Sequence, residues 1–132
     1  MKWGLDTSFI MRLLTGDPPD QAQAAAAWLA ELRNHGERPL VSDLVIAETY
    51  FALQSSYQVP KAEAIAALRE FLNSGDVEAT GAGAEVLRTA NLAAAKPGFV
   101  DRIIHAAYAD QHANLITFEK SAGKLPKAKV LP

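Results

Sequence analysis

The chain has 132 residues, which suits a single domain spanning residues 1–132. It contains no cysteine, so disulfides and thiolate metal sites are excluded and any metal must take oxygen or nitrogen ligands. The hydrophobic content of 49% excludes a disordered tail, and the net charge of −2 excludes a strongly basic nucleic-acid-binding protein.

The first half of the chain alternates strand-like and helix-like segments. Strands are expected at 2–5 and 40–42, and helices at 9–15, 21–35, 44–57 and 61–73. Gly16, Gly36 and Pro60 follow three of these helices and end them.

The second half continues the alternation. Strands are expected at 77–80, 114–117 and 129–131, and helices at 83–96 and 100–112, with a short turn or helix before the last strand. Strands separated by helical crossovers indicate an α/β protein whose mostly parallel sheet is covered on both faces, as a three-layer α/β/α sandwich. Such a sheet places its ligand site at the carboxyl ends of the strands.

No membrane span and no secretory signal are expected. A charge at Asp6 comes too early for a signal core, and no apolar run approaches the length that crosses a bilayer. The absence of cysteine fits a reducing compartment. We therefore expect a soluble, cytoplasmic protein with no membrane partner.

Four acidic residues occupy positions where catalytic acids would stand in this architecture. Asp6 directly follows the first strand, and Glu119 follows the strand at 114–117. Glu48 lies on a helix face whose neighbours at helical spacing are apolar, so we expect it to be drawn towards the interior and to need a partner or a metal. Asp101 begins a helix.

Each acid also has an ordinary structural explanation. Asp6 and Asp101 suit helix capping or stabilisation of the helix dipole. Glu48 would reach water if it lay at the edge of the apolar stripe, and Glu119 would be a solvated loop acid. Their shared expected location, at one edge of the sheet, is what favours a common function.

Four clustered carboxylates repel one another, and a hard divalent cation relieves that repulsion. Mg²⁺ or Mn²⁺ takes oxygen ligands and accepts phosphate oxygens, and it can activate water for displacement at phosphorus. The pattern therefore favours metal-assisted hydrolysis of a phosphodiester.

Four segments together resemble the PIN domain family, and in particular its VapC-type toxins. They are residues 5–17, which begin Leu-Asp-Thr-Ser-Phe, residues 41–48, which end Ile-Ala-Glu, residues 101–107, which read Asp-Arg-Ile-Ile-His-Ala-Ala, and residues 116–119, which read Ile-Thr-Phe-Glu. The resemblance covers nearly the whole chain in order and spacing.

The resemblance implies a five-stranded parallel sheet and a metal-dependent endoribonuclease acting as the toxin of a toxin–antitoxin pair. It implies catalytic acids at Asp6, Glu48, Asp101 and Glu119, although the family usually has aspartate at the fourth position. Asp6 and Asp101 would bind the metal directly, and Glu48 would hold a second ion or orient the attacking water.

The resemblance also implies supporting residues and partners. Thr7, Ser8 and Thr117 would contribute hydroxyl groups to the outer part of the site or to the substrate. The partners would be an RNA substrate, a VapB-like antitoxin and a second copy of the chain.

Other functions remain open at this stage. A non-catalytic PIN-like domain that binds RNA or a partner is favoured by the glutamate at the fourth acid position. A phosphatase would need a second aspartate where Ser8 stands, and a phosphoaspartyl receiver lacks paired acids early in the chain. Four lysines after Glu119 suit phosphate contact or an ordinary solvated surface; they are Lys120, Lys124, Lys127 and Lys129.

Overall fold

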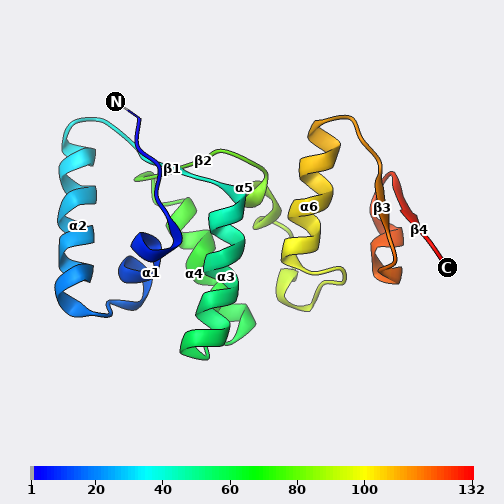
Figure 1. The fold of residues 1–132 in the computed structure, drawn as a ribbon, viewed down its shortest axis with the longest axis horizontal. Coiled ribbons are helices and arrows are strands. Elements are labelled where there is room, and N and C mark those ends of the chain that lie inside the picture. The colour runs from blue at the N-terminus through cyan, green and yellow to red at the C-terminus, as the bar shows by residue number, and fades with distance from the viewer. Residues whose placement is uncertain (1) are drawn as a thin grey trace.

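The computed structural model describes residues 2–132, and Figure 1 shows their arrangement. The helices alternate with short strands. They are α1 (Thr7–Thr15), α2 (Pro19–Asn34), α3 (Asp43–Tyr57), α4 (Lys61–Leu72), α5 (Gly83–Val86) and α6 (Phe99–Asp110), with short 3₁₀ segments η1 (Leu92–Ala94) and η2 (Lys120–Lys124).

The strands are short, and all of their pairings are parallel. β1 (Leu40–Val41) pairs with β2 (Glu78–Ala79), and Gly4 forms a parallel bridge to Leu40 on the other edge of β1. β3 (Leu115–Thr117) pairs with β4 (Ala128–Val130) in a second sheet. The α/β class and the parallel pairing are confirmed, whereas the single five-stranded sheet is not, because β3 and β4 do not join β1 and β2.

The core forms around α3 and α4. Its largest fully buried side chains include Phe99, Ile10, Ile46, Leu68, Leu87 and Val41. Side-chain and backbone caps position the first helices: Ser42 Oγ accepts a hydrogen bond from Val45 N at 3.3 Å, and Gly16 ends α1 in the left-handed conformation. α1 and α3 pack side by side, so the start of α1 meets α3 at Glu48.

The helix predicted at 83–96 is wrong over most of its length. In the structure α5 ends at Val86, and only η1 follows before α6. Arg69 Nε donates a hydrogen bond to the Leu87 carbonyl at 2.7 Å, and that carbonyl would otherwise bond within the helix. Asn91 then takes a left-handed conformation at φ 55°, which a continuing helix does not tolerate.

Residues 111–132, which we call the C-terminal arm, extend to one side of the molecule. Figure 1 shows α6 standing between the arm and the rest of the chain. The arm is attached to α6: His105 Nε2 lies 2.7 Å from the carbonyl oxygen of Pro126, and the two form a hydrogen bond. Within residues 2–132, no helix is both long enough and apolar enough to cross a bilayer.

Candidate active site

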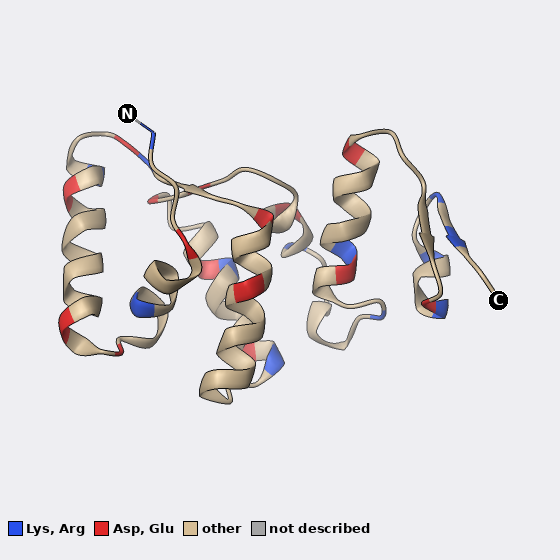
Figure 2. Ribbon diagram, viewed as in Figure 1, with Lys and Arg blue, Asp and Glu red and all other residues tan. Residues whose placement is uncertain are grey.

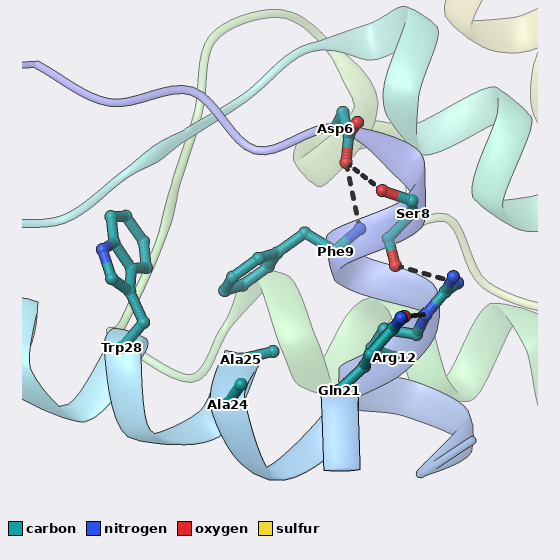
Figure 3. A pocket seen from close by; sticks show the side chains of 8 residues that line it. All are labelled: Asp6, Ser8, Phe9, Arg12, Gln21, Ala24, Ala25 and Trp28. Atoms are coloured by element: carbon teal, nitrogen blue, oxygen red, sulfur yellow. Dashed lines mark hydrogen bonds between the residues drawn. The ribbon is translucent and has the colours of Figure 1, made fainter. Parts of the chain in front are cut away.

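Asp6 lies between the Gly4 bridge and the first turn of α1. Its Oδ1 accepts hydrogen bonds from Phe9 N at 3.0 Å and from the Ser8 hydroxyl at 2.7 Å (Figure 3). The Phe9 N–H, then the Ser8 hydroxyl, and also the charge of Arg12 hold the pKa of Asp6 below its ordinary value. Asp6 is therefore the N-cap of α1, as one interpretation of the sequence predicts, and it stays ionised.

Glu48 reaches the same place from α3. The Thr7 hydroxyl donates a hydrogen bond of 2.9 Å to Glu48 Oε1 and joins two segments 41 residues apart. Because Thr7 is the first residue of α1 and Asp6 is its cap, this bond brings the loop that carries Asp6 beside Glu48. We call Asp6 and Glu48 the N-terminal acid pair.

The surroundings of Glu48 differ from the expectation. We expected an apolar face to draw its carboxylate inward, but Glu48 is exposed, as are Leu44 and Phe51 on the same face of α3. The side chains of Leu44 and Phe51 are 72% and 54% accessible to solvent. The expectation fails because no element of the described chain covers this face of α3.

Asp101 and Glu119 line one hollow on the arm side of α6, and Asp101 also borders a second hollow between α3 and α6. Asp101 is exposed in the first turn of α6, whose N-cap position is Gly98, so Asp101 is not the cap. Together with Thr117, Ile104 and Tyr108, the two acids line a hollow of about 260 Å³ between α6 and the arm. We call Asp101 and Glu119 the C-terminal acid pair.

The Glu119 carboxylate is already engaged. Its Oε1 accepts hydrogen bonds from Ser121 N at 3.2 Å and from the Ser121 hydroxyl at 2.9 Å, so Glu119 caps η2. The Ser121 N–H, then the Ser121 hydroxyl, and also the charge of Lys96 hold the pKa of Glu119 below its ordinary value. Thr117 Oγ1 accepts a hydrogen bond from Glu119 N at 3.0 Å, which orders the turn after β3.

The structure thus arranges the four acids as two pairs. Within residues 2–132, no group of three or more acidic or histidine side chains is close enough to hold one metal ion. The sequence predicts a single cluster because it places all the strand ends at one edge. The arm separates the pairs, since β3 lies beyond α6 instead of beside the Gly4 strand.

A profile of the PIN domain family matches residues 5–128, a span that includes both acid pairs. The chain belongs to the PIN domain family. No curated protein and no solved structure matches it. PIN domains are generally nucleases, and they typically use divalent metal ions.

A further acid in this PIN domain has a structural role. Asp43 follows the end of β1, yet its Oδ1 accepts a hydrogen bond from Gly83 N at 2.8 Å and its Oδ2 accepts one from Ala82 N at 3.0 Å. The carboxylate also fills the space where a side chain at Gly81 would lie. Asp43 fastens the start of α5 to α3 and leaves neither oxygen free for a metal.

Asp6, one member of the N-terminal acid pair of this PIN domain, borders a hollow of about 470 Å³ between α1 and α2. Arg12 Nε donates a hydrogen bond of 2.7 Å to Gln21 Oε1 on one wall, and Trp28 forms part of another (Figure 3). Sequence reasoning missed Gln21, since nothing in the local pattern shows that α2 turns it towards Arg12. A guanidinium and an amide beside ionised Asp6 suit contact with a phosphodiester and a base.

Proposed function

We propose that this PIN domain is a Mg²⁺- or Mn²⁺-dependent endoribonuclease that hydrolyses RNA phosphodiester bonds. The observation that carries the proposal is the hydrogen bond from Thr7 to Glu48, which brings a second carboxylate beside the ionised Asp6. Together with membership of a family of nucleases, it favours hydrolysis over simple binding.

The oxygen atoms of the N-terminal acid pair suit a hard cation. Asp6 Oδ1 is held in place by Phe9 and Ser8, and Glu48 Oε1 is held in place by Thr7. Carboxylate oxygens without nitrogen or sulfur donors are what Mg²⁺ and Mn²⁺ prefer. The resemblance assigns Asp6 and Asp101 to the same ion, although the structure places these two side chains in different pairs; a bound ion would activate water and neutralise charge at phosphorus.

The chain's own residues have distinct tasks in this proposal. The Phe9 N–H and the Ser8 hydroxyl keep Asp6 ionised and fixed in direction, and the Thr7 hydroxyl fixes the direction of the Glu48 carboxylate by restricting its rotamers. Glu48 would hold a second ion or orient the attacking water. Thr117 orders the turn that carries Glu119, and Arg12 contacts a phosphate of the substrate.

The biological setting follows from the VapC-like segments described above. The domain would be the toxin of a toxin–antitoxin pair, would act in the cytoplasm without a membrane partner, and would form a homodimer. A VapB-like antitoxin would inhibit it by placing a basic side chain, typically arginine, among the carboxylates. Residues 1–132 would form one three-layer α/β/α domain around a five-stranded sheet.

A non-catalytic binding module is the second candidate. The observation that favours it is the Glu119 carboxylate, whose Oε1 already accepts two hydrogen bonds from Ser121. A carboxylate used as a cap is less free to bind a metal, and the family's usual aspartate is missing from this position.

The test is cleavage of total cellular RNA by purified, partner-free protein. Wild type and Asp6→Asn are incubated with Mg²⁺ or Mn²⁺, with and without EDTA. Discrete fragments from wild type alone, lost with EDTA, are expected. Absence of cleavage by folded wild type in both metals favours the binding module, and turnover of a chromogenic phosphomonoester would instead favour a phosphatase.

A further inference from the structure

The N-terminal strand has one unpaired edge. Leu5 N donates a hydrogen bond to the Leu40 carbonyl at 2.9 Å, and Leu40 N donates one to the Trp3 carbonyl at 2.8 Å. Because backbone groups alternate along a strand, the N–H and C=O of Gly4 point away from β1. No described residue pairs with that edge, so it is open to a further strand.

β3 has a matching edge. Leu115 N donates a hydrogen bond to the Lys127 carbonyl at 3.0 Å, and Leu131 N donates one to the Thr117 carbonyl at 2.8 Å. The N–H and C=O of Ile116, between them, therefore point away from β4. Each edge thus offers one residue with a free backbone N–H and C=O, Gly4 on one edge and Ile116 on the other. Every strand pairing in the described chain is parallel.

The arm and α3 also carry exposed apolar side chains. Ile116 and Phe118 of the arm are 64% and 72% exposed, and Leu44 and Phe51 leave one face of α3 uncovered. Exposed apolar groups of this size mark surfaces that are buried against another chain segment.

The charges of the two regions are complementary. Residues 111–132 contain four lysines and one acid, whereas residues 1–110 contain nine basic and fourteen acidic side chains. Figure 2 shows basic residues along the arm and acidic residues distributed over the helices of the body. The arm therefore suits a surface that carries the N-terminal acid pair.

The arm is held away from its own N-terminal strand. Phe99 and Ile103 anchor α6 in the core, with the ring of Phe99 5.1 Å from that of Tyr50 between centroids. The connection from α6 to β3 is only four residues long, and the bond between His105 and Pro126 ties the arm to α6. The arm lies on the far side of α6, where a second molecule can reach it.

We infer that two copies of this chain exchange their C-terminal arms, so that β3 of one copy pairs in parallel with the Gly4 strand of the other. Each exchanged sheet would then run β2, β1, Gly4 strand, β3 and β4, which are the five parallel strands that the sequence predicts. A twofold dimer makes this contact reciprocally. Ile116 and Phe118 would cover the exposed face of α3.

The exchange would also complete the active site, and this part of the inference rests on the proposed function. In parallel pairing of the two free edges, Gly4 lies opposite Thr117, because a residue that faces the new strand pairs with one that faces away from it. Asp6 then lies opposite Glu119, where the carboxyl ends of both strands meet at one edge. Each site would then combine the N-terminal acid pair of one copy with Glu119 of the second copy.

A disulfide test decides the exchange without any assay of activity. In the register that places Gly4 opposite Thr117, Lys2 lies opposite Leu115, on strands about 4.8 Å apart, which is within the range a disulfide spans. The chain has no native cysteine, so the variant Lys2→Cys with Leu115→Cys contains only the designed pair. The control replaces Leu115→Cys by Glu63→Cys, an exposed position on α4.

We expect mild oxidation at low micromolar concentration to give a covalent dimer with the designed pair and none with the control. A monomer containing an internal disulfide would show that the arm closes on its own chain, and would overturn the exchange. Absence of any disulfide, or dimers that form equally with the control, would overturn it as well.

A second experiment tests the shared site. Asp6→Asn and Glu119→Gln chains, each with a different tag, are co-expressed and the mixed dimer is purified through both tags. Exchange leaves one intact site in each mixed dimer, so about half of the wild-type rate is expected where either variant alone is inactive. No recovery, or full activity of Glu119→Gln alone, contradicts completion of the site by the second copy, while the disulfide result stands whether or not the chain cleaves RNA.

Discussion

Replacing Asp6 separates its role as a helix cap from its role as a charge. Asp6→Ala removes the oxygen that accepts hydrogen bonds from Phe9 N and Ser8 Oγ, whereas Asp6→Asn retains a side-chain oxygen for Phe9 N. Loss of an N-cap costs about 1 kcal/mol of unfolding free energy, and asparagine caps about as well as aspartate. For a chain of 132 residues, 1 kcal/mol lowers the Tm by about 3–4 °C.

We therefore expect Asp6→Ala to melt about 3–4 °C below wild type and Asp6→Asn to melt within about 1 °C of it. Both variants should lose cleavage of RNA, because both remove the carboxylate. Differential scanning calorimetry and the RNA assay measure the two effects on the same samples. An Asp6→Asn protein that cleaves RNA at the wild-type rate, or that melts as low as Asp6→Ala, would refute this reasoning.

The stabilising effect of Asp6 should also depend on pH. Its pKa in the folded chain is below the ordinary value of an aspartate, because the Phe9 N–H and the Ser8 hydroxyl favour the ionised form. A carboxylate whose pKa is lowered by folding contributes stability that is present above its unfolded pKa and is lost as the pH falls through the folded one. The Tm difference between wild type and Asp6→Ala should be constant from pH 7 to 5 and should shrink below pH 4. A difference that stays constant down to pH 2.5 would contradict the assignment.

Two further substitutions test the site and its support. Thr7→Val removes the hydrogen bond to Glu48 at an exposed position, so we expect RNA cleavage to fall roughly 10–100-fold with a Tm close to wild type; an unchanged cleavage rate would contradict the role of Thr7. Gly81→Ala places a methyl group against the Asp43 carboxylate and disturbs its hydrogen bonds to the start of α5, so thermal denaturation should show a loss of about 2–3 kcal/mol of unfolding free energy. The control is Gly123→Ala, whose new methyl group would lie 3.5 Å from its nearest neighbour. Its unfolding free energy should stay within about 0.5 kcal/mol of wild type. Equal losses from the two glycine substitutions would show that Asp43 does not fasten α5.

Local sequence patterns predicted those features that short-range physics determines. The helices at 44–57 and 61–73 match α3 and α4 within about a residue, because caps and breakers act on the turns next to them. Asp6 at the end of the first strand was predicted both as a cap and as a site residue, and its geometry suits both interpretations. The parallel pairing also follows, because each pair of strands is separated by a helical crossover.

The sequence patterns did not predict features that depend on contacts between distant segments. The end of α5 depends on Arg69, 18 residues away, which takes the Leu87 carbonyl. The exposure of Glu48 depends on whether any element covers its face of α3. An apolar stripe in the sequence does not show whether the same chain or a second copy covers it. The separation of the acid pairs depends on the side of α6 on which β3 lies, and nothing in the alternation of residues at 114–117 determines that side.

Mn²⁺ binding by RNA-free protein, measured by electron paramagnetic resonance, tests the metal site without depending on finding the right RNA. We expect wild type to bind Mn²⁺ and Asp6→Asn, which keeps the cap of α1, to bind it at least about tenfold more weakly. Equal binding by the two proteins, or no binding by folded wild type, would contradict a metal site built on Asp6.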